Sequence, residues 1–168
     1  VSNEWRESAG LEKTLGCAAE TYPVVSEWVA AGQKEYDDWK AAGSNGYFDS
    51  VNLFVLDTMV GGKAVNDLEL VRTLAGNSAD AIDWLDGIGA ELHNVGSFGG
   101  ASVKRIHRPV NAEGKTVSVG AYIIPVLEKA CADAGVEIIY NAPVTEILMD
   151  GGKAVGVKAE GYTVNAKS

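Results

Sequence analysis

The residues with the clearest chemical potential stand in one run, Gly96 to Pro109, with the sequence GSFGGASVKRIHRP. Gly99 and Gly100 have no Cβ, so a ligand or another stretch of backbone can approach their main chain closely. Basic and titratable side chains follow at once, at Lys104, Arg105, His107 and Arg108. The combination indicates a backbone that lies against a flat ligand. A glycine bulge at the start of an ordinary strand explains the same residues, and local chemistry alone favours that bulge.

Two other groups of polar residues also need a chemical interpretation. The basic run can be the solvated face of a strand or one wall of a site, and the pattern does not decide between them. Three carboxylates, Asp80, Asp83 and Asp86, recur at helical spacing. Their spacing projects them together toward solvent and no basic partner accompanies them, so they are predicted to form a wet helix face rather than a catalytic group.

The elements that position the glycine run are predicted from apolar spacing. Residues 4–42 are predicted to be helical, with breaks at Pro23 and Gly43, and their aromatic side chains to pack in the core. Phe48 to Met59 is expected to be a short helix. A long helix follows, capped by Asn66 or Asp67 and ending at Ile88. The residues expected to turn inward on it are Leu70, Val71, Leu74, Ile82, Trp84 and Leu85.

The second half of the chain mixes strands with one helix. A short strand is expected at 91–95, and the turn residues 111–115 predict a hairpin after Pro109. A helix is predicted from Ser118 or Gly120 to Ala134, followed by a buried strand at 136–140. A β-meander is expected at the end, over 144–149, 154–159 and 162–166. The fold class is therefore α+β, with a helical N-terminal third, a long middle helix, a hairpin, a helix and a small antiparallel meander.

Length and charge bound the function. A chain of 168 residues has room for one domain with a core, and 46% hydrophobic residues is globular usage. Residues 1–90 carry 15 acidic and 6 basic side chains, whereas 91–168 carry 8 of each. Such an acidic chain argues against nucleic acid as a partner. Cys17 and Cys131 lack metal-ligand spacing. No apolar run approaches the roughly 20 residues of a membrane span. The sequence does not decide whether the protein is cytoplasmic or periplasmic.

Ordered blocks of sequence resemble one family. The blocks are DTMVGG at 57–62, ND at 66–67, ADAIDWLDGIG at 79–89, GGASVKRIHRP at 99–109 and VGAY at 119–122. They are similar, in this order, to the FAD-dependent fumarate reductase flavoproteins, which include flavocytochrome fumarate reductases and urocanate reductase. The resemblance implies that 1–168 is a single internal part of a larger FAD-binding domain, with a helical segment at 1–60 and a family-like flavin segment at 61–168.

The resemblance also implies roles for individual residues. Gly99, Gly100, Ala101, Ser102 and His107 are expected to bind FAD on the side of its ring, although His107 also suits a strand histidine whose ring bonds to backbone. Val144, after Asn141-Ala142-Pro143, matches the place where the family's main chain passes the adenine. Phe98 stands where fumarate reductases carry a methionine against the substrate's double bond. This departure puts fumarate in doubt and favours a larger or flatter unsaturated substrate.

Some family features are missing from these residues. The sequence contains no Gly-x-Gly-x-x-Gly turn for the FAD pyrophosphate and no substrate-clamping motif. The family's catalytic arginine and its clamp residues do not occur, so no catalytic residue is assigned, and Arg105 and Arg108 are not put in their place. The isolated chain is expected to be inactive, to bind FAD weakly and to self-associate.

The resulting function prediction is a fragment of an FAD-dependent oxidoreductase that reduces an activated C=C bond of a small unsaturated substrate. Its electron donor would be a haem or FMN domain or protein. Two alternatives remain open at this point: an acidic interaction or small-ligand-binding module without redox chemistry, and a flavin-dependent ketosteroid-type dehydrogenase.

Overall fold

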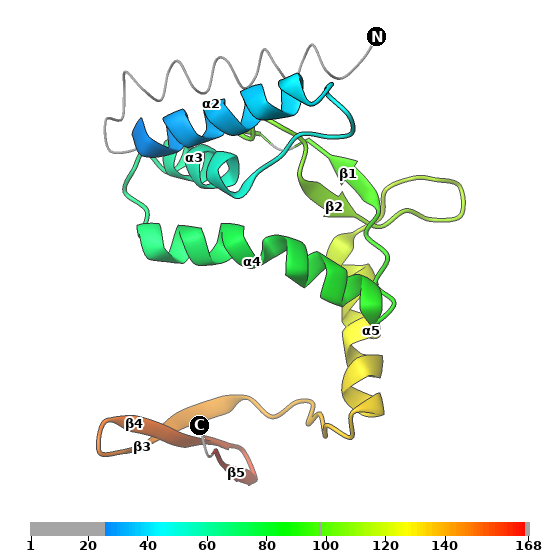
Figure 1. The fold of residues 1–168 in the computed structure, drawn as a ribbon. Helices are drawn as coiled ribbons and strands as arrows, with labels where there is room; N and C mark the ends of the chain where they lie inside the picture. The colour runs from blue at the N-terminus through cyan, green and yellow to red at the C-terminus, as the bar shows by residue number, and fades with distance from the viewer. Residues whose placement is uncertain (1–25, 98, 167–168) are drawn as a thin grey trace. The chain divides into compact units, whose positions relative to one another are not determined.

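The computed structural model describes residues 26–97 and 99–166, so the helix predicted before Ser26 lies outside the described residues. The chain divides into two compact units, Val1–Val126 and Leu127–Ser168. The fold class is α+β, as predicted, with helices first and small antiparallel sheets after them (Figure 1). That 1–168 form a single domain remains a prediction.

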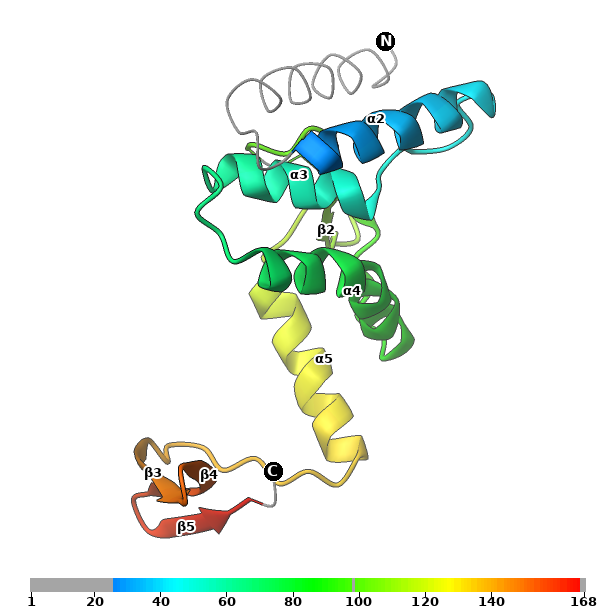
Figure 2. The same cartoon turned by 60° about the vertical axis from the view of Figure 1, so that its left-hand side comes forward.

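The first unit contains three helices around one apolar core. They are α2 (Ser26–Ala41), α3 (Val51–Gly61) and α4 (Leu68–Gly87), and α3 lies between the other two in both views (Figures 1 and 2). The helix α3 is apolar on nearly all sides, as expected for a helix covered on two faces. Its buried residues Leu53, Val55, Leu56 and Met59 make up the centre of the core.

The start of α3 is fixed by a side-chain cap. Ser50 has extended backbone geometry, and its Oγ accepts a hydrogen bond from the Leu53 backbone N–H at 3.1 Å. Such a cap satisfies one of the N–H groups that a helix leaves without a partner at its N-terminus. The short helix expected between Phe48 and Met59 is therefore present.

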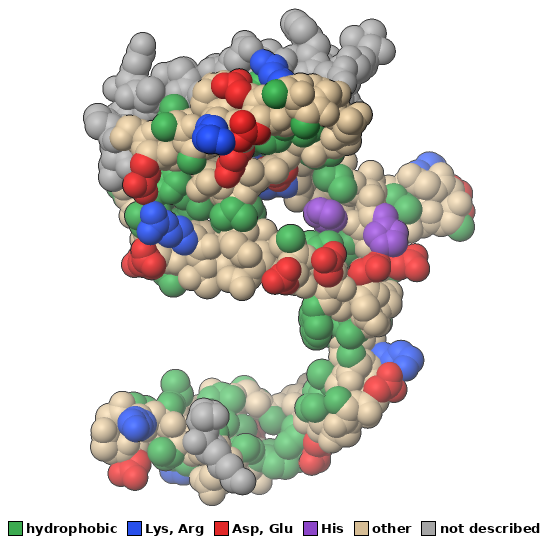
Figure 3. Space-filling model, in the orientation of Figure 1, with side chains coloured by type: hydrophobic (Ala, Val, Ile, Leu, Met, Phe, Trp, Pro, Cys, Tyr) green, Lys and Arg blue, Asp and Glu red, His purple; other side chains and the backbone are tan. Residues whose placement is uncertain are grey.

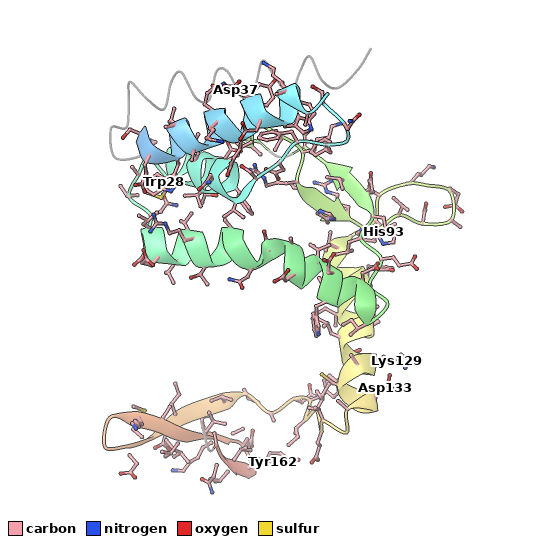
Figure 4. The ribbon with its side chains drawn as sticks, in the orientation of Figure 1. Trp28, Asp37, His93, Lys129, Asp133 and Tyr162 are labelled. Atoms are coloured by element: carbon pink, nitrogen blue, oxygen red, sulfur yellow. The ribbon has the colours of Figure 1, made fainter. Side chains whose placement is uncertain are left out.

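The aromatic residues of α2 pack in the core, as the sequence predicted for this helix. Tyr36, Trp39 and Phe48 have ring centroids 5.3 to 5.8 Å apart. Trp28 is 5% exposed and lies on the side of α2 that faces the rest of the unit (Figure 4). The guanidinium of Arg72 lies 5.5 Å from the Trp28 ring centroid, which adds a contact between α4 and α2.

The long helix α4 begins and ends where the sequence predicted. Its buried face, however, is narrower than expected and consists of Val71 and Ala75. Leu70, Leu74 and Trp84 are 69%, 57% and 57% exposed, so the prediction that they turn inward is wrong in this chain. Helical spacing identifies residues that can share a face, but it does not supply a neighbouring element to cover all of them.

The acidic face of α4 is exposed, as predicted (Figure 3). The expectation that these carboxylates lack a basic partner is wrong for Asp86, whose Oδ1 lies 2.6 Å from Nε2 of His93. Figure 4 shows His93 beside the C-terminal end of α4. Both side chains are more than half exposed, so the pair stabilises the chain by little.

The N-cap of α4 gives a first testable prediction. Asp67 is extended, and its Oδ1 accepts a hydrogen bond from the Leu70 backbone N–H at 3.1 Å. Replacing it by alanine removes this bond and a negative charge from the helix N-terminus, so Asp67→Ala should lower the free energy of unfolding by about 1 kcal/mol. Chemical denaturation of the purified chain measures the change. Asp67→Ser should restore most of the loss, and an unchanged midpoint in Asp67→Ala would rule the cap out.

A two-stranded antiparallel sheet follows α4. The strands are β1 (Asn94–Gly96) and β2 (Ile106–Arg108), with Val95 opposite His107. The predicted strand at 91–95 thus begins three residues later. The hairpin predicted after Pro109 is reduced to a loop closed by one bridge, Val110 to Thr116, because β2 takes its ladder from β1 instead.

The helix α5 (Val119–Asp133) matches the predicted helix, and Pro125 is within it. Figure 4 shows Lys129 and Asp133 one turn apart on its C-terminal half, where they form an exposed ion pair. The strand predicted at 136–140 is wrong. This segment has no β partner in the described part of the chain, and a strand without a partner leaves its backbone N–H and C=O groups unpaired.

The second unit ends in the predicted meander. Its strands β3 (Val144–Asp150), β4 (Lys153–Ala159) and β5 (Tyr162–Asn165) pair in that order, all antiparallel. Ile147, Val157 and Val164 stand opposite one another across the sheet, and apolar side chains are exposed over it in Figure 3. Among the helices of the described residues, none is long and apolar enough to cross a bilayer.

Candidate functional site

A cavity of about 530 Å³ opens in the first unit between α3 and residues 99–105, the segment before β2 that is called the glycine segment below. Small-molecule sites in proteins usually have roughly 300–1,000 Å³, so this volume suits a ring-sized ligand. One wall comes from α3 and the other from the segment before β2. The lining residues are Phe54, Asp57, Thr58, Gly61, Gly99, Gly100, Ala101, Arg105 and Ile106.

The glycines leave the backbone open on the cavity wall. Among the described residues, a Cβ added to Gly99 or Gly100 would meet no heavy atom within 4 Å, and Gly100 has φ +95°, which L-residues rarely adopt. Both lie in a turn, and β2 begins only at Ile106, so they are not a bulge of this strand pair. Space at the backbone with no protein atom to fill it is what close approach of a ligand requires.

An ion-pair network forms the base of the glycine segment. Oδ2 of Asp57 accepts hydrogen bonds from the Ser102 backbone N–H and from the Ser102 Oγ, both at 2.9 Å, and from Nη1 of Arg105 at 2.7 Å. Arg105 also donates from Nε and Nη2 to the two carboxylate oxygens of Asp49, at 3.0 and 2.8 Å. Its guanidinium lies 4.5 Å from the centroid of the Phe54 ring. These contacts join α3 to the segment before β2.

The charges of this network are already paired. Burial acts to lower the pKa of Arg105, but the hydrogen bonds and negative charges of Asp49 and Asp57 outweigh it and raise that pKa above its ordinary value. The guanidinium is therefore positive at any working pH and is engaged on Nε and both terminal nitrogens. Of the residues that line the cavity, Asp57 and Arg105 carry the charge, so this wall suits an uncharged ring better than a carboxylate.

The predicted site residues divide into four groups. Gly99, Gly100 and Ala101 line the cavity. Ser102 is buried against Asp57, and the ring of His107 lies off the lining, with Nδ1 3.1 Å from the Leu92 carbonyl oxygen. Val144 is 58% exposed and belongs to the second unit. Phe98 lies outside the described residues. The binding roles of all of them remain predictions.

Sequence reasoning missed the α3 wall of the cavity. Asp57 was recognisable in principle, because it is the one ionisable residue in the helix sequence VNLFVLDTMVG. A carboxylate at a buried position is retained where it is paired, so its isolation among apolar neighbours marks a network. Thr58 and Gly61 stand with Asp57 in the block DTMVGG, which carried the family resemblance, but no binding role was assigned to them. Phe54 has no comparable signal, since its type is ordinary in a core helix.

The residues present fit one end of a flavin. An open glycine backbone, a ring-sized volume whose two lining charges pair with each other, and the aromatic Phe54 suit the ring system of FAD. The pyrophosphate is a different matter, since proteins hold it on a helix N-terminus after a glycine turn and the sequence has no Gly-x-Gly-x-x-Gly run. Within the described residues, no cluster of His, Cys, Asp and Glu is arranged to hold a metal ion.

Comparison with known proteins identifies the family. The helical core, the glycine-lined cavity and the following meander define a segment of a ligand-binding α+β domain. The model of the FAD binding domain family matches residues 39–167, and the chain belongs to this family. FAD is therefore the cofactor indicated for the domain.

The similar proteins are larger than this chain. The fumarate reductase (cytochrome) of Shewanella frigidimarina is 39% identical over 114 residues, which cover 67% of this chain and 19% of that protein. Ifc3 of strain NCIMB 400, named a probable fumarate reductase, is 35% identical over 83% of this chain and 24% of its own length. The open conformation of a flavocytochrome c3 fumarate reductase matches with a TM-score of 0.66 at 36% identity, covering 79% of this chain and 23% of that one. The chain thus spans about a fifth to a quarter of these relatives.

Proposed function

We propose that this chain is part of a flavoprotein that reduces the activated C=C bond of a small unsaturated substrate. The observation that carries the proposal is the cavity beside Gly99 and Gly100, in a segment that matches the FAD binding domain family. Similarity to proteins named fumarate reductases supports the reaction class. When bound, the flavin would supply the hydride.

The chain's own residues have binding and orienting tasks in this proposal. The main chain of Gly99 to Ala101 lies along the flavin ring, and Phe54 and Ile106 keep the cavity apolar so that water is excluded. In the proposal, the main chain at Val144 would hold the adenine of FAD. Arg105 would not be the acid that protonates the substrate carbon after hydride addition, because it is engaged by Asp49 and Asp57. The electrons would come from a haem or FMN group of another domain or protein.

The test uses the full-length protein that contains these residues. Its purified form should carry FAD and, with a chemically reduced electron donor, should oxidise that donor when enoates are added under anaerobic conditions. A panel of fumarate, urocanate, acrylate and a ring ketone separates the reaction classes. Flavin without turnover of any enoate would reject the reductase proposal. A second assay replaces the reduced donor by an oxidised electron acceptor, and reduction of that acceptor when the ring ketone is added would favour the steroid-type alternative.

Phe98 gives a prediction about substrate size. A phenylalanine next to the glycines occupies more width than the methionine expected from the resemblance, and aromatic rings are flat and stiff where methionine is flexible. Phe98→Met in the full-length protein should raise kcat/KM for small dicarboxylates relative to bulkier enoates by about tenfold, the scale of a shape change in an apolar pocket. Steady-state kinetics on the pair measures this ratio. If it does not move, Phe98 takes no part in substrate selection.

A further inference from the structure

The strongest feature outside the assigned residues is the carboxylate of Asp57. It stands on an otherwise apolar helix, and its side chain is 4% exposed. Oδ2 accepts three hydrogen bonds, whereas Oδ1 is buried and has no hydrogen-bond partner in the described part of the chain. A half-satisfied buried carboxylate is costly, so hydrophobic packing alone does not account for an aspartate at this position.

The partners of Asp57 show what it holds. Ser102 directly follows Ala101, and its backbone N–H and hydroxyl both bond to the same oxygen. Arg105, 11% exposed, continues the network to Asp49 and lies over Phe54. One carboxylate on α3 therefore fastens the end of the glycine segment that lies opposite α3 across the cavity. The Asp57 side chain thus joins the two walls of the cavity through its contacts with Ser102 and Arg105.

We propose that Asp57 and Arg105 are positioning residues that fix the glycine segment at the distance from α3 that a flavin ring needs. Neither is a ligand for a charged group. Oδ2 of Asp57 already accepts three bonds, Arg105 donates from Nε, Nη1 and Nη2, and two carboxylates around one guanidinium leave a net charge of the same sign as a phosphate or carboxylate. This inference rests on the proposed function and names residues that act through the backbone of Gly99 to Ala101.

The experiment compares flavin binding in the full-length protein with Asp57→Asn and Arg105→Lys. Asparagine keeps an oxygen for Ser102 but loses the ion pair, and lysine replaces the three nitrogens that Arg105 uses by a single one, so it does not reproduce the two-sided contact with Asp49 and Asp57. We expect the FAD dissociation constant of either variant to be about tenfold larger than that of the wild type. The visible absorption and circular dichroism of the bound flavin should also change. The double variant should lose little more than each single one, because both act on one network.

Arg72 is a matched control for Arg105. It also pairs with two carboxylates, Glu27 at 3.1 Å and Glu69 at 3.3 Å, and it lies over an aromatic ring, but it is not part of the cavity lining. Arg72→Lys should leave the FAD dissociation constant within twofold of wild type and the flavin spectrum unchanged. If Asp57 and Arg105 only stabilise the fold, their variants should keep the wild-type FAD affinity and flavin spectrum, as Arg72→Lys does, when variants with an equal loss of thermal stability are compared.

Asp49→Asn is the milder variant. The Asp49 side chain is 31% exposed, and this substitution removes only one of the two carboxylates that pair with Arg105. It should weaken FAD binding about threefold, and it keeps the test decisive if Asp57→Asn does not fold. If Arg105→Lys and Asp49→Asn keep the wild-type flavin spectrum and FAD affinity, the inference is wrong, whereas the proposed function is not affected. A full-length wild type without flavin would overturn the proposed function, and this inference with it.

Discussion

Gly100→Val in the full-length protein should lose bound FAD, with affinity reduced at least a hundredfold. Two effects act together. Gly100 has φ +95°, where a β-branched residue is strained, and a Cβ there has no protein atom within 4 Å, so the new methyl groups point into free space that the proposal gives to the flavin. The strain alone would cost on the order of 1–3 kcal/mol. Flavin absorbance of the purified variant, compared with wild type, measures the occupancy.

Gly89 separates strain from obstruction. It has φ +92°, it also has no heavy atom within 4 Å of an added Cβ, and it is not among the residues that line the cavity. Gly89→Val therefore introduces a similar backbone strain without a methyl group at the cavity wall, and it should keep its flavin. Equal occupancy in Gly89→Val and Gly100→Val would contradict close approach of the cofactor to Gly100.

A second matched pair tests the opposite wall. Gly61 and Gly76 both lie in helices, and neither has a heavy atom within 4 Å of an added Cβ, but only Gly61 lines the cavity. Alanine raises helix propensity at both, by roughly 0.5–1 kcal/mol each. Gly61→Ala should nevertheless weaken FAD binding several-fold while Gly76→Ala leaves it unchanged. Stability and affinity would thus move in opposite directions at Gly61 alone.

Local signals predicted well wherever the chain itself satisfies its backbone. The cap at Asp67 and the turn between β3 and β4 are decided by residues within a few positions, and both form as expected. The segment 136–140 has the composition of a buried strand, but it finds no strand to pair with among the described residues. The strand prediction for this segment is therefore wrong because a partner strand is missing, not because its residues have a low strand propensity.

The candidate site also contains features that local sequence signals reveal and features that depend on tertiary contacts. Gly99 and Gly100 were singled out because a missing Cβ is visible in the sequence, but their expected binding role came from the family resemblance, since local chemistry alone favoured a bulge. The structure places both glycines in the lining of a cavity. Asp57 is separated from Ser102 by 45 positions, so its role depends on a tertiary contact that no local pattern encodes. Exposure of Leu70 and Trp84 on α4 likewise depends on what lies beside the helix, which helical spacing does not contain.

The 168-residue chain by itself should bind FAD weakly, with no saturation in the micromolar range, and should show no reductase activity. FAD is held chiefly through its pyrophosphate, by N–H groups at a helix N-terminus after a glycine turn, and the sequence has no Gly-x-Gly-x-x-Gly run. Contacts at the ring beside Gly99 and Gly100 and at the adenine beside Val144 would leave the middle of the ligand unfixed. Ordering several rotatable bonds costs about 0.5–1.5 kcal/mol for each flexible group, which two short contacts hardly offset.

The same chain should also self-associate. Trp84 on α4 is 57% exposed, and Ile147 and Met149 on the terminal sheet are 60% and 59% exposed, so both units present apolar surface to water. Sedimentation velocity should show a weight-average mass that rises with protein concentration, and Trp84→Glu should reduce it. Titration of FAD with detection by flavin fluorescence quenching then decides between two kinds of protein. Saturable binding at micromolar or lower FAD by a monomeric chain would mean that residues 1–168 hold the dinucleotide without the usual glycine turn, and the chain would be a flavin-binding module in its own right.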